Sequence, residues 1–381
     1  MKAAIVLTTI SVPVVLSSYC RNIETYGHKD EVEFIVVGDM KTPSEAGDYV
    51  QHLVGRGFKA LYLDIKAQAK WLEPYPALGE IIPYNSDNRR NVGYLVAAER
   101  GVEIIISIDD DNYAVSEEDF VGGHSIVGKD VSGRRMLGAA NKWLNVCNPM
   151  CDLVVASSPA YYSIKNMYAR GFPYSRRFQD SFVPVKENTG KVMVNEGFWL
   201  KDPDVDAIAR LNDQVAVIRT GNGRIILAKD NYCPINSQNT AYHRELLPCM
   251  YFVAMGFNYN GLKVDRYGDI WMGYFMLKVL HHTGGFVCFG KPTVRHIRNK
   301  HNLLNDLYLE LGGMLLTERL VDFLDAIELI KTNYADAYLE LGDRLDALAQ
   351  GSDLGDDAKD YFRRLKQNMG IWVEACSGVM R

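Results

Sequence analysis

Residues 102–113 constrain the fold most strongly, because an apolar strand pattern there ends abruptly in three carboxylates. The run Val-Glu-Ile-Ile-Ile-Ser-Ile is rich in β-branched residues and is typical of a buried strand. Asp109, Asp110 and Asp111 follow it at once. A buried carboxylate without a compensating partner costs several kcal/mol. The triplet must therefore lie at the carboxyl end of the strand, where it faces water or a cation.

The spacing within the triplet suggests what that cation would be. Asp109 and Asp111 flank Asp110 as a D-x-D pattern, which offers hard oxygen ligands to Mg²⁺ or Mn²⁺. In open α/β sheets ligands bind at the carboxyl edge of the strands, and a divalent ion there could hold a diphosphate. Taken alone, the triplet equally allows an acidic turn that caps the next segment.

Residues 1–112 alternate strand-like and helix-like patterns. Strands are expected at 3–10, 32–38 and 60–65, and helices at 14–27, 44–55 and 91–100. This alternation predicts a doubly wound α/β sheet. Asp39 follows the second strand directly, which places it on the same edge as the triplet. No G-x-G-x-x-G or Walker lysine loop is present, so no flavin or NAD is expected and a metal is favoured as the anchor for a nucleotide.

Composition excludes several classes of protein. The net charge of −5 gives no reason to expect nucleic-acid binding, which needs a basic face. No apolar run reaches the ~18 residues of a membrane span. The first residues lack the pattern of a signal peptide, and seven scattered cysteines do not indicate a disulfide framework. A cytoplasmic location is expected.

Several runs occur in a fixed order along the chain. They are residues 108–111 (IDDD), 170–177 (RGFPYSRR), 197–200 (GFWL), 202–206 (DPDVD) and 266–273 (RYGDIWMG). Together they resemble the reversibly glycosylated polypeptide, or UDP-arabinopyranose mutase, family (glycosyltransferase family 75), over roughly residues 3–320.

The resemblance implies a GT-A-type, Rossmann-like α/β fold over residues 1–300. Residues 1–112 would bind the nucleotide, and residues 113–300 the sugar or an acceptor. Residues 301–381, where leucines recur at helical spacing, would form a helical C-terminal extension. This extension is expected to lie outside the resemblance, to carry no chemistry of its own and to offer a surface for a homo-oligomer.

The resemblance also implies a nucleotide sugar, with UDP preferred, and a divalent ion, Mn²⁺ or Mg²⁺. His296, just past a late strand, would complete a metal site with Asp109 and Asp111. Arg90, which precedes the metal strand, would contact the diphosphate. Asp110 would contact sugar hydroxyls. Asp39 would accept hydrogen bonds from the uracil or the ribose.

Arg170 and Arg177 acquire roles from the same resemblance. In the family, an arginine at the first position accepts the sugar reversibly, and the second is needed for activity. A guanidinium stays protonated, with a pKa above ~12, so a nucleophilic Arg170 would need a neighbouring carboxylate and a dry pocket. Asp269 would orient the sugar or act as a base. The family has two adjacent aspartates at this place, whereas this chain has Gly268-Asp269.

Three functions remain open on the sequence. A mutase would hold the sugar on Arg170 and return it to the diphosphate with a changed ring size. A glycosyltransferase would pass the sugar to a separate acceptor, a small molecule or a polymer. A non-catalytic member would serve as a partner subunit, although the intact triplet and arginine pair argue against that role. The two arginines favour the mutase.

Overall fold

The computed structural model describes residues 2–155, 166–179, 181–187, 189–299 and 302–380. Its centre is a mixed sheet of ten strands in the order β3-β2-β1-β4-β13-β9-β16-β12-β6-β8. The strands are β3 (Lys59–Leu63), β2 (Val32–Gly38), β1 (Ala3–Thr9), β4 (Ile104–Ile108), β13 (Asn239–His243), β9 (Lys191–Glu196), β16 (Gly285–Phe289), β12 (Ile225–Leu227), β6 (Met136–Gly138) and β8 (Val183–Val185).

The first four strands of this order are parallel, as the apolar runs predict. Leu7 pairs with Ile108, and Thr9 pairs with Gly38. The carboxyl ends of β1, β2 and β4 therefore meet at one edge of the sheet. This register brings the side chains that follow these strands together at that edge.

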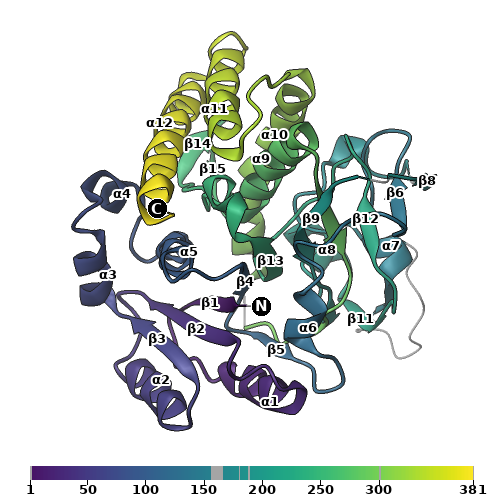
Figure 1. Cartoon of the computed structure of the whole chain (residues 1–381). Helices are drawn as coiled ribbons and strands as arrows, with labels where there is room; N and C mark the ends of the chain where they lie inside the picture. Colours follow the sequence, from purple (N-terminus) through teal and green to yellow (C-terminus); the bar gives the residue numbers. More distant parts are fainter. Residues whose placement is uncertain (1, 156–165, 180, 188, 300–301, 381) are drawn as a thin grey trace.

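Helices cover both faces of the parallel part (Figure 1). They are α1 (Leu16–Tyr26), α2 (Glu45–Gly55), α3 (Ile65–Leu72), α4 (Pro76–Ile81) and α5 (Arg90–Glu99). Helix α5 packs on β1 and β2, and it is buried along nearly its whole length because α12 (Asp356–Val379) lies against it. The predicted strands and helices of this region are confirmed to within a few residues.

A second sheet of five short strands lies beside the large one, in the order β5-β17-β10-β11-β7. Its strands are β5 (Asn112–Ala114), β17 (Val294–His296), β10 (Trp199–Lys201), β11 (Val215–Thr220) and β7 (Cys151–Val155). A two-stranded ribbon is formed by β14 (Phe257–Tyr259) and β15 (Leu262–Val264). Because β5 directly follows the Asp triplet and pairs with β17, the triplet joins the two sheets.

Helix α9 (Gly268–Thr283) was not expected from the sequence. It is buried on almost every face, so its apolar residues show no one-sided helical period. The remaining short helices are α6 (Phe120–His124), α7 (Cys147–Met150) and α8 (Ala207–Asn212), with 3₁₀ segments η1 (Asp87–Arg89), η2 (Tyr174–Arg176) and η3 (Arg244–Cys249).

The C-terminal part is helical, as predicted. Helix α10 (Leu303–Ala326) packs on β15 and α8, α11 (Tyr334–Gln350) packs on α9, and α12 packs on α11 and α5. The molecule is thus the predicted α/β fold with a helical C-terminal part. The two predicted halves share one sheet through the pairing of β4 with β13, and the boundaries at residues 112 and 300 stay predictions. Within the described residues, none of the helices has the length and apolar character that a membrane crossing requires.

Candidate functional site

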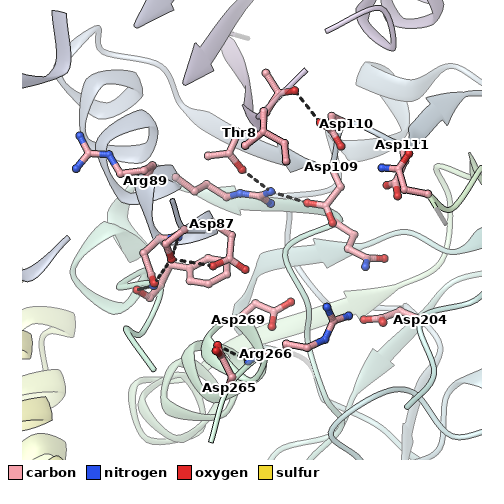
Figure 2. Close-up of a pocket in the computed structure, with 18 of the residues that line it drawn as sticks. Thr8, Asp87, Arg89, Asp109, Asp110, Asp111, Asp204, Asp265, Arg266 and Asp269 are labelled. Atoms are coloured by element: carbon pink, nitrogen blue, oxygen red, sulfur yellow. Dashed lines mark hydrogen bonds and ion pairs between the residues drawn. The ribbon is translucent and has the colours of Figure 1, made fainter. Parts of the chain in front are cut away.

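A cavity of about 640 Å³ lies at the carboxyl edge of β1, β2 and β4. We call it the donor cavity. Every site residue predicted from the sequence lines it except Arg177. The residues concerned are Asp39, Arg90, Asp109, Asp110, Asp111, Arg170, Asp269 and His296. Figure 2 shows the Asp triplet on one side of the cavity and Asp204 and Asp269 on the other.

Arg90 orients the first carboxylate of the triplet. Its Nη2 donates to Asp109 Oδ1 at 2.5 Å, and the guanidinium also donates to Thr8, Ser107 and Ser237. The Arg90 side chain is only 3% exposed. Burial raises the pKa of Asp109, and the neighbouring Arg90 charge opposes that rise. The position of Arg90 therefore suits the orientation of Asp109 better than direct contact with a diphosphate.

The other two carboxylates of the triplet point to different partners. Asp110 accepts a hydrogen bond from the Thr9 hydroxyl at 2.7 Å. Burial raises the pKa of Asp110, whereas this hydrogen bond lowers it. Asp111 Oδ2 lies 3.2 Å from Nε2 of His296.

Asp111 and His296 form the part of the cavity best suited to a metal. His296 Nδ1 lies 2.7 Å from the carbonyl oxygen of Asp202. With Nδ1 donating to that oxygen, Nε2 is the nitrogen left for a metal, which is the arrangement that supports metal-ligating histidines. When Nε2 is protonated, it donates to Asp111 instead. Burial opposes the charged form of the ring, but Asp111 outweighs it, so the pKa of His296 is raised.

The donor set fits an ion that the substrate helps to bind. In the part of the chain that the structure describes, no three His, Cys, Asp or Glu side chains converge as ligands. Mg²⁺ and Mn²⁺ commonly take one or two protein carboxylates and complete their shell with phosphate and water. Asp111 and His296 fit that pattern, and a nitrogen ligand favours Mn²⁺ over the harder Mg²⁺.

Arg170 lies between two carboxylates on the opposite wall. Its Nε donates to Asp204 at 3.0 Å, and its Nη1 and Nη2 donate to the two oxygens of Asp269 at 3.2 and 2.9 Å. Nη1 also donates to the carbonyl oxygen of Arg266. All three side chains are 8–9% exposed. Both conditions set for a reactive Arg170, a neighbouring carboxylate and a site largely closed to water, are therefore present.

The electrostatics of this arrangement favour the cation. Although burial opposes the charged form, Asp204 and Asp269 together raise the pKa of Arg170 well above its usual value. In turn Arg170 outweighs burial and lowers the pKa of Asp204. The resting state is a buried guanidinium held by two carboxylates.

Asp269 is held in place by the start of helix α9. It lies in the first turn, where it complements the helix dipole and accepts the Ile270 N–H at 2.9 Å. At position 268 a Cβ would overlap the carbonyl oxygen of Val253 and lie 2.9 Å from the Phe252 ring. Gly268 therefore reflects a close approach of helix and loop, and this backbone has no room for a second aspartate.

Arg177 lies outside the donor cavity. It donates to Asp206 at 2.7 Å, it is stacked on the Tyr174 ring at 3.7 Å, and it donates to the carbonyl oxygen of Phe172. Asp206 in turn caps helix α8 by accepting the Ala209 N–H. These contacts fit a residue that fixes the 170–177 loop.

Asp39 also lines the donor cavity. It accepts the backbone N–H groups of Met40 and Ser86. It is 7% exposed.

Two acidic residues that sequence reasoning missed interact with the charge of Arg170. Asp204 lies inside one of the matched runs, 202–206, so that run was the available signal. Glu196, at the end of β9, is 3% exposed, and its Oε2 has no hydrogen-bond partner among the described residues. Burial and the Asp204 charge raise the pKa of Glu196 well above its usual value.

A third acidic residue that sequence reasoning missed lies in the C-terminal helices. Glu310 of α10 lines the donor cavity, accepts the Ala207 N–H at 2.8 Å and pairs with Arg266 at 3.1 Å. Residues 301–381, expected to carry no chemistry of their own, thus supply one residue to the lining of the donor cavity. Helix α10, packed against α8 and β15, reaches the lining of the cavity, which leucine spacing could not reveal.

A family model described as "Reversibly glycosylated polypeptide" matches residues 75–380, well over half of the chain. The chain belongs to the reversibly glycosylated polypeptide family. The family recognition made from the ordered motifs is thus confirmed. The match runs through the C-terminal helices, so the expectation that they lie outside the family is wrong.

Several curated relatives of the chain are plant proteins. The chain is 27% identical over 298 residues to probable UDP-arabinopyranose mutase 1 of Pisum sativum, covering 77% of this chain and 72% of the pea protein. It is 27% identical to UDP-arabinopyranose mutase 3 of Arabidopsis thaliana and 26% identical to UDP-arabinopyranose mutase 1 of Oryza sativa subsp. japonica, with the same coverage. The predicted enzyme class, mutase or glycosyltransferase, is confirmed.

Solved structures show a distant likeness. Glucosyl-3-phosphoglycerate synthase from Mycobacterium tuberculosis, in complex with Mn²⁺, UDP-glucose and phosphoglyceric acid, has a TM-score of 0.40 at 13% identity, with 83% of this chain and 79% of that chain covered. TarS 1-349 from S. aureus, in complex with UDP-GlcNAc, has a TM-score of 0.40 at 11% identity, with 100% and 90% covered.

Proposed function

We propose that this chain is a metal-dependent UDP-sugar enzyme that breaks the bond between sugar and diphosphate and holds the sugar reversibly on Arg170. The observation that carries the proposal is the pairing of two walls in one cavity. One wall carries the Asp triplet with His296, and the other carries Arg170 between Asp204 and Asp269. The first suits a diphosphate with its counter-ion, and the second suits capture of a sugar.

In this proposal the donor lies along the carboxyl edge of the sheet. Asp39 accepts hydrogen bonds from the uracil or the ribose, and Asp110 from sugar hydroxyls. Asp111 and His296 would hold Mn²⁺ or Mg²⁺, with Asp109 oriented beside them by Arg90. When bound, the ion would neutralise charge on the leaving diphosphate and fix its position.

The covalent step uses Arg170 and a carboxylate that already accepts its proton in a hydrogen bond. The bond from the anomeric carbon to the diphosphate oxygen breaks, and UDP leaves with the electron pair. A guanidinium nitrogen of Arg170 bonds to that carbon, and its proton passes to Asp269, whose Oδ2 lies 2.9 Å from Nη2. Return of the sugar to the diphosphate reverses each transfer. A change of ring size before return gives the mutase product.

The free-energy cost of moving the proton from Arg170 to Asp269 decides when the proton moves. Transfer of a proton from an arginine to an aspartate, each at its usual pKa, is uphill by about 12 kcal/mol. A turnover of about 1 s⁻¹ corresponds to a total barrier of about 17 kcal/mol. Prior deprotonation would thus consume most of the barrier, and the raised pKa of Arg170 makes it costlier still. Proton transfer therefore accompanies capture of an already cationic sugar and does not precede it.

A glycosyltransferase is the second candidate function. Both Asp269 oxygens accept hydrogen bonds from Arg170. The charged form of Arg170, which this site strongly favours, also suits a guanidinium that only positions the sugar while a separate acceptor attacks it. A partner subunit without catalysis is the third.

NMR of a UDP-furanose incubated with the protein and Mn²⁺ separates these functions. Interconversion with the UDP-pyranose supports the mutase, provided that Arg170→Lys abolishes it while UDP binding is kept. Consumption of an added acceptor without interconversion would overturn the mutase in favour of transfer. Nucleotide binding without either reaction would identify a partner subunit.

A further inference from the structure

A second cavity of about 760 Å³ lies next to the donor cavity. It is bounded by β10, β11 and β17 of the five-stranded sheet. Consecutive residues of a strand point to opposite faces, and β17 shows this alternation. His296 is buried and lines the donor cavity, whereas Arg295 is exposed and lines the second cavity. The small sheet therefore separates the two cavities.

The lining of the second cavity is strongly cationic. Among its described lining residues four carry a positive charge, and Asp202 alone is acidic. The cations are Lys201, Arg210, Arg295 and Arg298. Leu200, Val215 and Ile218 supply an apolar wall beside them. A site with these features suits a small organic oxyanion, whose charged group meets the arginines and whose carbon skeleton meets the apolar wall.

Arg210 is the least exposed of these four cations. Its side chain is 10% exposed, and its Nε has no hydrogen-bond partner among the described residues. The Asp202 carboxylate lies 3.9 Å from its Nη1, too far for a hydrogen bond. Burial and the neighbouring Arg298 charge lower the pKa of Arg210 to about 10. A buried guanidinium beside a second arginine is costly unless an anion compensates it.

The acids on the donor side are already engaged. Asp204 is bound to Arg170, and Glu310 is bound to Arg266 and to the N–H of Ala207. Arg298 is itself paired with Asp306 at 2.9 Å, and Arg210 donates to the carbonyl oxygen of Pro203. Among the described residues, no carboxylate accepts a hydrogen bond from Arg210.

We propose that the second cavity is a separate binding site for a small organic oxyanion, a phosphate monoester or a carboxylate, which Arg210 and Arg298 hold at the wall between the two cavities. Both arginines line both cavities. The bound anion would therefore sit beside the nucleotide sugar and not in its place. The inference stands on the charge and burial of this wall and does not require the proposed chemistry at Arg170.

Calorimetric titration at constant ionic strength tests the proposal. The probes are glycerol 3-phosphate, malonate and inorganic phosphate, each added with and without saturating UDP and Mg²⁺. We expect saturable binding of an organic probe that persists when UDP is bound. Tighter binding of glycerol 3-phosphate or malonate than of inorganic phosphate would support a site that also contacts carbon. Equal or tighter binding of inorganic phosphate would overturn the organic ligand class.

Variants locate the site. Arg210→Gln is expected to weaken binding of the organic probe about tenfold or more, since a hydrogen bond to a charged group contributes about 1.5–3 kcal/mol. Arg295→Gln changes an exposed residue outside the donor cavity. It is expected to weaken binding of the organic probe severalfold and to leave the affinity for UDP unchanged. Arg219→Gln, on the same sheet but lining neither cavity, is the matched control and should bind as the wild type does.

Three further results would overturn the proposal. The first is the absence of saturable binding of either organic probe. The second is full competition by UDP, which would assign the arginines to the donor diphosphate. The third is an equal loss in Arg219→Gln and Arg295→Gln, which would show a non-specific charge effect. Because the readout is binding of the probe, these results are independent of whether the sugar reaction at Arg170 occurs.

Discussion

Replacing Arg170 with glutamine is expected to destabilise the fold in a pH-dependent way. The guanidinium lies between Asp204 and Asp269, and all three side chains are 8–9% exposed. Without the cation, two carboxylates face each other in a site from which water is largely excluded. Breaking a buried ion pair by removing one partner costs about 3–5 kcal/mol, and we expect a loss of this size at pH 8.

The sign of the pH dependence follows from Asp204. In the wild type Arg170 lowers the pKa of Asp204, so this carboxylate stabilises the fold above its unfolded pKa of about 3.9 and loses that effect only at lower pH. In Arg170→Gln the opposing charge is gone while burial remains, so the folded pKa of Asp204 rises above the unfolded value. The folded variant then binds more protons than the unfolded chain, and its stability increases as pH falls, by up to about 1.4 kcal/mol per pH unit for one proton.

Urea denaturation at pH 5, 6.5 and 8 measures this effect. The deficit of Arg170→Gln relative to the wild type should shrink toward pH 5, and Arg170→Gln combined with Asp204→Asn should recover part of the loss at pH 8. Arg219→Gln, whose pair with Asp152 is 79% and 50% exposed, should change stability by less than about 1 kcal/mol at every pH. A deficit in Arg170→Gln that is small or independent of pH would refute the electrostatic account of this site.

Three further substitutions test separate parts of the account. Asp111→Asn should abolish Mn²⁺-dependent UDP binding in calorimetry without changing the unfolding midpoint, and full retention of that binding would show the metal assignment to be wrong. Gly268→Ala should lower stability by about 1–3 kcal/mol through overpacking. Gly370→Ala, in open space within α12, should instead raise stability by up to about 1 kcal/mol. Equal thermal unfolding midpoints of the two variants would contradict the packing argument. Arg177→Lys should lower stability by about 1–2 kcal/mol, because it disrupts the buried ion pair with Asp206, and should leave UDP affinity unchanged. Weaker UDP binding at unchanged stability would place Arg177 in the site after all.

The parallel part of the fold could be predicted because its signals are local. Apolar runs that each end in a polar residue mark β1, β2 and β4, and they place Asp39 and Asp109 on one edge without knowledge of any contact. The five-stranded sheet gave no such signal, because several of its strands have only three residues. Helix α9 was missed because a helix buried on all faces has no apolar stripe.

Site residues that lie in sequence motifs could be predicted, whereas those brought to the site by packing could not. The motif at 170–177 pointed equally to Arg170 and Arg177, but only the folded chain distinguishes them. Arg170 turns to the cavity, while Arg177 stacks on Tyr174 outside it. Glu310 enters from a helix more than a hundred residues beyond the motif, and no spacing rule connects the two positions.

The mass of the intact protein after incubation with a UDP-sugar and Mn²⁺ tests the role of Arg170 most directly. We predict an adduct of one sugar unit that maps by peptide sequencing to Arg170, that disappears on addition of excess UDP, and that is absent in Arg170→Lys and in Asp111→Asn. An adduct on another residue, or sugar turnover by a protein that never carries an adduct and is unaffected by Arg170→Lys, would contradict it.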